Sequence, residues 1–404
     1  MKAVILAGGK GTDLFPLTQT RPKPMITLLG KPILQYLIKE LKEIGLTDIL
    51  IVTGYKGEQI RDYFKKGSDF GVCIHYADQG ESIGIEAALL AAEDFVKNES
   101  EFLLLFGDVV SEKGLMLRAL NAFENTQADM TMTLTLQGDT GDFGMVDIDS
   151  MGMVKKAGIK KADPQSQSNY VDAGCFVIRT DIFEEIKNKA TLSQAINNRI
   201  EKGDKVAAAI WEKDWIDIGK PWNIIEANKL LLSKLTVSKI AKDVYISSNV
   251  ELKNVVIIDE NTEISSGTVL NGPLYIGPNS YIGNNVLIRN HCSIGKGSIV
   301  GFGSEIKNSV LFDESKVYRL CYVGDSVIGQ NSVLSSGVIT VNTETPKKEV
   351  IMNINGEKMN TGLMKLGAIV GDNCEIGVNT LILPGRKIAS GSTIAPGSII
   401  KEDS

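Results

Sequence analysis

The sequence predicts two folds in one chain: an α/β unit with a mainly parallel sheet, followed by a coil of short parallel strands. Two observations support this. Apolar strands and amphipathic helices alternate over the first 235 residues, which is typical of a parallel sheet with helices on both faces. An aliphatic side chain then recurs at every sixth position from residue 246 to 306, and again from 370 to 400. This period fits a coil whose turns stack on a common axis.

The N-terminal half is predicted to be Rossmann-like, because buried strands and helices follow one another. In such sheets ligands bind beyond the carboxyl ends of the strands, so the loops at Gly8, Gly54 and Gly107 should share one rim. We assign residues 1–235 to this domain. The predicted strands are 3–6, 49–52, 72–76 and 102–106, and the predicted helices are 31–44, 57–64 and 86–96.

The C-terminal repeat resembles the hexapeptide repeats of left-handed parallel β-helices, with Ile-Gly pairs such as Ile276-Gly277 and Ile376-Gly377. We assign residues 236–404 to this domain. The resemblance implies a homo-oligomer, a trimer formed through the β-helix. A hairpin insertion is predicted near residues 342–365, turning at Asn355-Gly356.

Composition excludes several functional classes. The net charge is −6 without a long basic run, which argues against nucleic acid as a partner. The five cysteines form no C-x-x-C pair, so we expect free thiols in a reducing compartment. With two histidines in the chain, a zinc site has few ligands to draw on. No apolar stretch reaches about 18 residues, so we expect a cytoplasmic protein without membrane span or signal peptide.

The loop after the first strand reads Gly8-Gly9-Lys10-Gly11-Thr12. Three glycines let backbone N–H groups approach a ligand and form a nest for anions. The loop is not a Walker A motif, since no G-K-[ST] follows at the required distance. By itself it indicates a phosphate site or a tight structural turn.

The continuation of this loop is more specific. It reads L-A-G-G-K-G-T-D-L-F-P-L-T from Leu6 to Thr18, then R-P-K-P-M from Arg21 to Met25. This resembles the signature of the sugar-1-phosphate nucleotidylyltransferases, and W-I-D-I-G from Trp215 fits as well. The resemblance implies transfer of a nucleotidyl group from a nucleoside triphosphate to a sugar 1-phosphate, with release of pyrophosphate.

The resemblance also implies roles for individual residues. Lys23 matches the lysine that contacts the phosphates, and Asp108 and Asp217 match the carboxylates that hold Mg²⁺, a hard ion that prefers oxygen ligands. Gln79 has the donor and acceptor needed to read one edge of a base, which favours UTP or dTTP, with GTP possible. The implied NTP-binding residues are Leu6, Gly8, Gly9, Gly11, Thr12, Gln79 and Gly84, and the implied sugar-phosphate-binding residues are Gly144, Lys161 and Asp172.

Two positions depart from the family. Asp13 stands where the family has an arginine that faces the triphosphate. At about 4 Å and an effective dielectric of 20, one unit pair is worth about 4 kcal/mol, so this reversal needs compensation. Lys10 or Arg21 could supply it, or Asp13 could help to bind a cation. Lys160 replaces a glutamate that contacts sugar hydroxyls.

The C-terminal half resembles archaeal bifunctional enzymes that add an acetyl-CoA-dependent sugar-phosphate acetyltransferase. The stretch Y-V-G-D-S-V-I-G from Tyr322, Asn342, and K-L-G-A-I-V-G-D from Lys365 carry this resemblance. The family's general base is a histidine three residues before the tyrosine, where this chain has Arg319. An arginine stays protonated and cannot remove a proton. We therefore expect Arg319, Tyr322 and Asn342 to be vestigial.

Three functions remain open at this stage. The first is a sugar-1-phosphate nucleotidylyltransferase. The second is a weakly active or regulatory paralogue, assembled with an active paralogue, which Asp13, Lys160 and Arg319 favour. The third is a bifunctional enzyme, which Arg319 disfavours. A sharp gain in activity on Asp13→Arg reversion would indicate the second, whereas no gain would mean that the loop has another solution.

Overall fold

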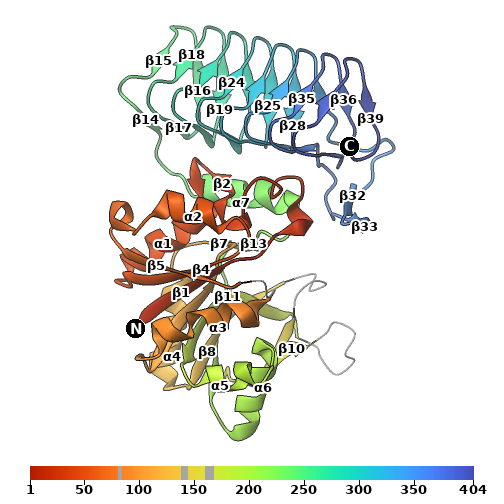
Figure 1. Cartoon of the computed structure of the whole chain (residues 1–404). Helices are drawn as coiled ribbons and strands as arrows, with labels where there is room; N and C mark the ends of the chain where they lie inside the picture. Colours follow the sequence, from red (N-terminus) through yellow and green to blue (C-terminus); the bar gives the residue numbers. More distant parts are fainter. Residues whose placement is uncertain (81–83, 138–143, 160–167) are drawn as a thin grey trace. The chain divides into compact units, whose positions relative to one another are not determined.

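The computed structural model describes residues 1–80, 84–137, 144–159 and 168–404 (Figure 1). These residues form two compact units. The first comprises Met1–Lys10, Pro22–Met25 and Ile33–Asp217, and the second comprises Gly11–Arg21, Ile26–Pro32 and Ile218–Ser404. The domain boundary at residue 235 stays a prediction from sequence.

The first unit is built on a nine-stranded sheet with the order β10-β9-β11-β6-β1-β4-β5, in which β8 pairs with β11 and β12. The strands β6, β1, β4 and β5 are parallel to one another, whereas β11 runs antiparallel to β6. The predicted Rossmann-like arrangement is confirmed, with a mixed extension beyond β6 in which β12 pairs parallel with β8. The strands are β1 (Lys2–Ala7), β4 (Asp48–Thr53), β5 (Cys73–Asp78), β6 (Glu101–Phe106), β8 (Met130–Leu136), β9 (Met145–Ile148), β10 (Val154–Ile159), β11 (Tyr170–Arg179) and β12 (Val206–Trp211).

Helices cover both faces of this sheet because successive side chains of a strand point to opposite sides. Ile5 of β1 lies in the core with Leu34, whereas its neighbour Val4 lies in the other core with Leu89. The helices are α1 (Ile33–Glu43), α2 (Gly57–Phe64), α3 (Ile85–Val96), α4 (Leu115–Thr126), α5 (Ile182–Lys187) and α6 (Leu192–Lys202), with short 3₁₀ turns at Lys23–Met25 and Ser68–Phe70.

The three glycine loops meet at one edge of the sheet, as predicted. The Tyr55 N–H, next to Gly54, donates to the Gly8 carbonyl at 3.0 Å, and the Gly107 N–H donates to the Leu6 carbonyl at 2.9 Å. Beside this edge, β7 (Val109–Ser111) pairs antiparallel with β13 (Trp215–Asp217). The rim therefore brings together residues that are far apart in sequence.

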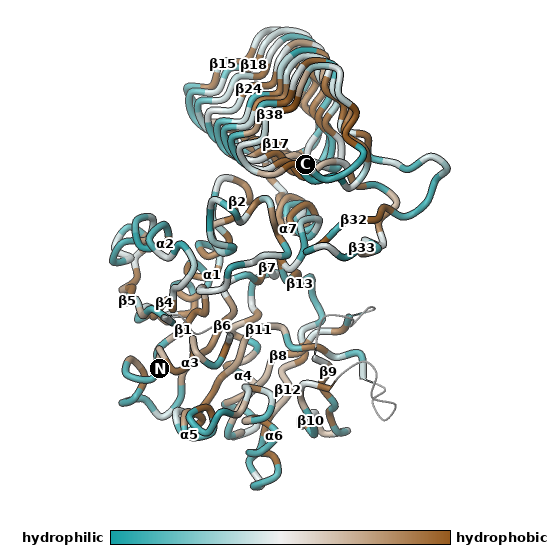
Figure 2. The backbone as a smooth tube through the Cα atoms, turned by 45° about the vertical axis from the view of Figure 1, so that its right-hand side comes forward, coloured by the Kyte–Doolittle hydropathy of each residue, from teal (hydrophilic) through white to brown (hydrophobic). Residues whose placement is uncertain are grey.

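The second unit contains the predicted β-helix, a coil of three eight-stranded parallel sheets. Aliphatic residues of the six-residue series, such as Ile264 and Ile294, are fully buried along its axis, and hydrophobic positions recur on successive turns (Figure 2). Leu252, near the first turn, is 39% exposed, since fewer turns cover it there.

The short strands of the coil fall into three sets. The first is β14 (Lys239–Ile240), β17 (Val256–Ile258), β20 (Leu274–Ile276), β23 (Cys292–Ile294), β26 (Val310–Leu311), β29 (Val327–Ile328), β34 (Ile369–Val370) and β37 (Lys387–Ile388). The second is β15 (Tyr245–Ile246), β18 (Glu263–Ile264), β21 (Tyr281–Ile282), β24 (Ile299–Val300), β27 (Lys316–Val317), β30 (Val333–Leu334), β35 (Glu375–Ile376) and β38 (Thr393–Ile394). The third is β16 (Glu251–Lys253), β19 (Val269–Asn271), β22 (Leu287–Ile288), β25 (Glu305–Lys307), β28 (Tyr322–Gly324), β31 (Ile339–Thr340), β36 (Leu381–Ile382) and β39 (Ile399–Ile400).

A hairpin leaves the coil between β31 and β34. Its strands β32 (Ile351–Ile354) and β33 (Glu357–Asn360) pair antiparallel. Asn355 and Gly356 form the turn with φ angles of 50° and 92°, the left-handed geometry that favours Asn-Gly. The second unit also holds α7 (Pro221–Ser233), β2 (Thr27–Leu28), β3 (Lys31–Pro32) and the 3₁₀ turn Thr12–Leu14. Lys31–Pro32, predicted as helix, instead pairs with β2, and α1 starts after Pro32.

Among the residues that the structure describes, none of the helices combines the length and the apolar character needed to cross a bilayer.

Candidate functional site

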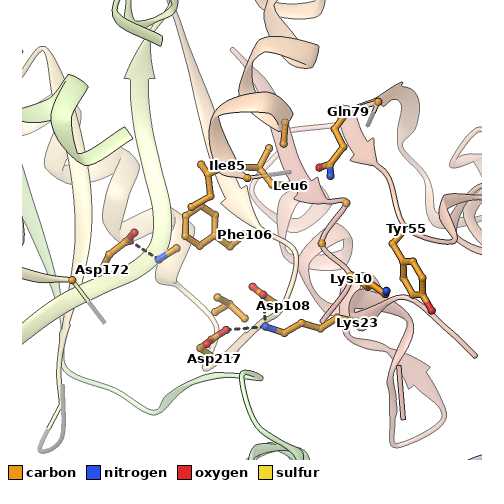
Figure 3. A pocket seen from close by; sticks show the side chains of 18 of the residues that line it. Leu6, Lys10, Lys23, Tyr55, Gln79, Ile85, Phe106, Asp108, Asp172 and Asp217 are labelled. Atoms are coloured by element: carbon orange, nitrogen blue, oxygen red, sulfur yellow. Dashed lines mark hydrogen bonds and ion pairs between the residues drawn. The ribbon is translucent and has the colours of Figure 1, made fainter. Parts of the chain in front are cut away.

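A cavity of about 730 Å³ opens at the rim of the first unit (Figure 3). It lies at the carboxyl ends of the parallel strands, where the topology predicts a ligand site. The cavity brings together ten predicted site residues. These are Leu6, Gly8, Gly9, Lys23, Gln79, Gly84, Asp108, Gly144, Asp172 and Asp217.

Lys23 is the centre of a charged cluster in this cavity. Its Nζ lies 2.5 Å from Asp108 Oδ2 and 3.4 Å from Asp217 Oδ1 (Figure 3). Although burial lowers the pKa of Lys23, the two neighbouring carboxylates together raise it above its usual value. The lysine is therefore a fixed cation at neutral pH.

The two carboxylates meet because β7 pairs with β13. Asp108 precedes β7 directly, and Asp217 is the last residue of β13, opposite Val109 in the register. The Oδ1 atom of Asp108 is buried, and no residue in the described part of the chain hydrogen-bonds to it. Carboxylate oxygens that converge with one atom unsatisfied form a donor set that suits a hard divalent cation.

Asp172 lies across the cavity from this cluster (Figure 3). Its Oδ1 accepts a hydrogen bond from the Gly174 N–H at 2.7 Å. Burial raises the pKa of Asp172 to about 7; the Gly174 hydrogen bond opposes this shift, and the charge of Asp217 adds to it. Near neutral pH this carboxyl group exchanges between a donor and an acceptor form.

Gln79 is held against the glycine loop at the end of β5. A Cβ at Gly8 would lie 2.2 Å from Gln79 Oε1, and one at Gly54 would lie 3.0 Å from Gln79 Cδ. Glycine at both positions therefore permits this packing. The Gln79 N–H donates to the Thr53 carbonyl at 2.9 Å, which fixes the residue at the rim.

Some lining residues were not predicted as site residues. Tyr55 lines the cavity, with the ammonium of Lys10 5.9 Å from its ring centroid. The prediction that Gly54 lies at the rim is confirmed, and the aromatic residue that follows Gly54 was a signal that could have found Tyr55. The others are Lys10, Gly80, Ile85, Ala88, Phe106, Val109, Gly174 and Trp215.

Several predicted positions lie elsewhere. Lys160 and Lys161 fall outside the described residues. Gly11 and Thr12 belong to the second unit, where the Gly11 carbonyl accepts a hydrogen bond from Thr18 Oγ1 at 2.6 Å. Gly11 itself is left-handed, with a φ of 61°, and caps the start of the 3₁₀ turn Thr12–Leu14.

Asp13 has partners within the second unit that the sequence did not predict. Lys220 Nζ lies 2.5 Å from Asp13 Oδ2, and Asn355 Nδ2 donates to Asp13 Oδ1 at 2.6 Å. The prediction that Arg21 neutralises the charge of Asp13 is wrong. The Arg21 guanidinium pairs with Asp372 and lies over the Phe312 ring. Lys220 directly follows the W-I-D-I-G motif, and this was the signal that could have found it.

The predicted acetyltransferase positions separate into two places in the second unit. Asn342 Nδ2 donates to Tyr322 Oη at 3.1 Å and lies 2.5 Å from Asp325 Oδ2. Arg319 is exposed and lines a different cavity, with Phe302 and Tyr318. The histidine of this unit, His291, contacts Ser233 Oγ at 3.1 Å.

Comparisons with known proteins agree with the fold. A family model described as nucleotidyl transferase matches residues 2–234, and one described as the GMPPB C-terminal domain matches residues 270–362. A solved structure described as a putative glucose-1-phosphate thymidylyltransferase from Bacillus anthracis superposes with a TM-score of 0.53 at 25% identity. It covers 59% of this chain and 98% of that one.

Two archaeal relatives match the whole chain. A "Bifunctional protein GlmU" from Methanococcus maripaludis is 38% identical, covering 100% of this chain and 95% of the relative. A "Bifunctional sugar-1-phosphate nucleotidylyltransferase/acetyltransferase" from Sulfurisphaera tokodaii is 34% identical, covering 100% of this chain and 98% of the relative. Since the family model spans more than half of the chain and these relatives match all of it, the chain belongs to the nucleotidyl transferase family.

Proposed function

We propose that the protein transfers a nucleotidyl group from a nucleoside triphosphate to a sugar 1-phosphate and releases pyrophosphate. The observation that carries this proposal is the cluster of Lys23, Asp108 and Asp217 at the rim of the α/β sheet. This reaction needs no covalent intermediate with the protein. It needs the sugar phosphate oxygen in line with the α-phosphorus, and cations that neutralise the phosphates.

The triphosphate would bind along the glycine loop. Backbone N–H groups at Gly8 and Gly9 would contact the phosphates, and we extend this to Gly11 and Thr12 from the signature. The Lys23 ammonium would stabilise negative charge as the bond to pyrophosphate breaks. Gln79, with the backbone of Gly84 and the side chain of Leu6, would hold the base. This favours UTP or dTTP, with GTP as the alternative.

We propose Asp108 and Asp217 as the residues that would hold Mg²⁺. The buried and unsatisfied Oδ1 of Asp108 supports this assignment, since hard divalent cations prefer carboxylate oxygens. When bound, the ion would supply positive charge to the phosphate oxygens. Lys23 would remain beside both carboxylates and keep their orientation.

The sugar 1-phosphate would occupy the side of the cavity near Gly144 and Asp172. A carboxyl group with a pKa of about 7 can accept a hydrogen bond from a sugar hydroxyl when ionised and donate one when protonated. Lys161, by its place in the signature, would meet the sugar phosphate. The choice of sugar would depend on position 160, where Lys160 replaces the family's glutamate.

Retention of activity rests on the partner of Asp13. The Lys220 ammonium neutralises the reversed charge on the signature loop, so the polyanion need not face an uncompensated carboxylate. This favours an active enzyme over a regulatory paralogue. The regulatory function, with an active paralogue as partner, remains the second candidate because Asp13 itself departs from the family.

We do not propose acetyl transfer, although the relatives named above are called bifunctional. Tyr322 and Asn342 lie together, but Arg319 stands where the resemblance implies a basic histidine. Release of free thiol from acetyl-CoA with amino-sugar phosphates is expected to stay at background. Assembly as a trimer through the β-helix and a cytoplasmic location remain further predictions.

The deciding experiment is a pyrophosphate-release assay with Mg²⁺ that crosses four sugar 1-phosphates with UTP, dTTP, GTP and CTP. We expect release with one pair well above the others, and loss of release in Asp108→Asn. If no substrate pair gave pyrophosphate release, and circular dichroism showed the protein to be folded, the enzyme hypothesis would be rejected. The regulatory paralogue would then be favoured.

A further inference from the structure

Three side chains with metal-binding atoms converge away from the cavity, on one face of the sheet. They are Asp48 at the start of β4, and Cys73 and His75 on the edge strand β5. Their ligand atoms, a carboxylate oxygen, Sγ and an imidazole nitrogen, all lie within 4.8 Å of one another. The two histidines of the chain predicted few ligands for zinc, but strand pairing brings three metal-binding atoms together.

The sheet itself fixes this arrangement. Cys73 and His75 are two residues apart on one strand and therefore point to the same face. Asp48 is the partner of Cys73 in the parallel register, so its side chain lies on that face too. The Cys73 N–H donates to the Thr47 carbonyl at 2.7 Å, and the His75 ring packs on Phe95 at a centroid distance of 5.1 Å.

The spacing of the three atoms suits a small tetrahedral cation. His75 Nε2 lies 3.0 Å from Asp48 Oδ1 and 3.4 Å from Cys73 Sγ. Ligands at about 2.0–2.3 Å from a tetrahedral zinc ion stand about 3.3–3.8 Å apart. The third pair, Asp48 with Cys73, lies within 4.8 Å, so side-chain shifts on the order of 1 Å would bring all three atoms to one ion.

The geometry at His75 separates this cluster from a catalytic proton relay. The same nitrogen of His75, Nε2, faces both the thiol and the carboxylate. A Cys-His-Asp proton relay needs one partner on each ring nitrogen, whereas a metal needs three atoms aimed at one point.

We propose that Asp48, Cys73 and His75 form a binding site for a borderline-soft divalent cation of the zinc class. Thiolate and imidazole ligands select such an ion over Mg²⁺, which prefers oxygen alone. Three protein ligands leave one coordination position for water. The ion would join the edge strand β5 to β4 where both strands begin, at Cys73 and Asp48.

The difference in exposure among the five cysteines allows a direct test of this proposal. Cys73 is exposed, whereas Cys175, Cys292, Cys321 and Cys374 are buried. Burial raises the pKa of each of these four thiols. In the folded protein, an aromatic disulfide reagent should therefore titrate one fast thiol, and Cys73→Ser should remove it.

The experiment measures the labelling rate of the metal-free full chain with Zn²⁺, with Mg²⁺ or without metal. We expect one equivalent of Zn²⁺ to slow the fast phase by at least about tenfold, because a coordinated thiolate is withdrawn from reaction. Mg²⁺ should leave the rate unchanged. Co²⁺ should give a thiolate charge-transfer band that is absent in Cys73→Ser.

Ligand variants decide between a site and a reactive surface thiol. His75→Ala and Asp48→Asn should each weaken Zn²⁺ protection by at least about tenfold, the smallest effect typical even for residues that only support ligands. His291→Ala and Asp69→Asn, which change groups outside the cluster, should retain it. Unchanged labelling with excess Zn²⁺, or full protection in both ligand variants, would overturn the proposal.

Discussion

The ion pair between Asp13 and Lys220 leads to the sharpest prediction about activity. The Lys220 ammonium lies 2.5 Å from Asp13 Oδ2, and the Asp13 side chain is 39% exposed. A unit pair at about 4 Å is worth about 1 kcal/mol in water and about 4 kcal/mol at an effective dielectric of 20. Because solvent screens this half-exposed carboxylate, we take about 1–2 kcal/mol as the working value.

Lys220→Ala leaves the carboxylate of Asp13 on the signature loop without its cation. We expect kcat/KM for the triphosphate to fall by about 5- to 30-fold, the factor that corresponds to 1–2 kcal/mol. The assay is pyrophosphate release with the best substrate pair. Asn355→Ala serves as the matched control, because it removes a neutral partner of Asp13 and should have the smaller effect.

Substitution of Asp13 also tests whether Lys220 compensates its charge. Asp13→Arg alone should bring no gain, because the arginine would face Lys220 with like charge. The exchange Asp13→Lys with Lys220→Asp should recover activity lost in either single variant. A sharp gain from Asp13→Arg alone would refute compensation by Lys220 and indicate a protein whose catalysis has decayed at this residue.

Three further predictions concern the cavity. Lys23→Met should lower kcat by at least about 100-fold, as expected for loss of a group that stabilises transition-state charge; an effect on KM alone would show that Lys23 only binds substrate. Asp172 retains its proton in the folded state up to about pH 7 and loses it near pH 4 when unfolded. The unfolding free energy should therefore fall between these pH values, and urea titrations of Asp172→Asn should show a flatter profile; parallel profiles would contradict the raised pKa. Gly8→Ala should displace the Gln79 side chain, since the added Cβ would lie 2.2 Å from Oε1. The KM for the triphosphate should then rise at unchanged unfolding temperature, and an unchanged KM would remove Gln79 from base binding.

Periodicity in the sequence predicted the coil and the parallel part of the α/β sheet. The six-residue series predicted the coil because each turn must bury one aliphatic residue per side, as Ile264 and Ile294 do. The strand and helix order predicted the parallel part of the sheet. The antiparallel strands after β6 were not predicted, since pairing such as that of β8 with β11 is non-local and leaves no period along the chain.

The signature motif predicted the residues that gather in the cavity, including Lys23 and both carboxylates. Whether they bind the proposed substrates stays a prediction. The cation site at Asp48 was missed because its ligands come from two strands, and neither strand alone has metal-ligand spacing. Pairing between Asp48 and Cys73 creates the cluster, and pairing is visible only in the fold.

The contacts of Asp13 show why a departure from a family motif cannot be judged at its own position. Lys220 is 207 residues from Asp13 in sequence, and Asn355 is 342 residues away at the tip of the β32–β33 hairpin. Both are residues of the second unit, as Asp13 is. A charge that is reversed on the loop but neutralised by a lysine after the W-I-D-I-G motif leaves the local sum of charge at zero. The effect of Asp13 therefore depends on Lys220, and the two residues should be mutated together as well as singly.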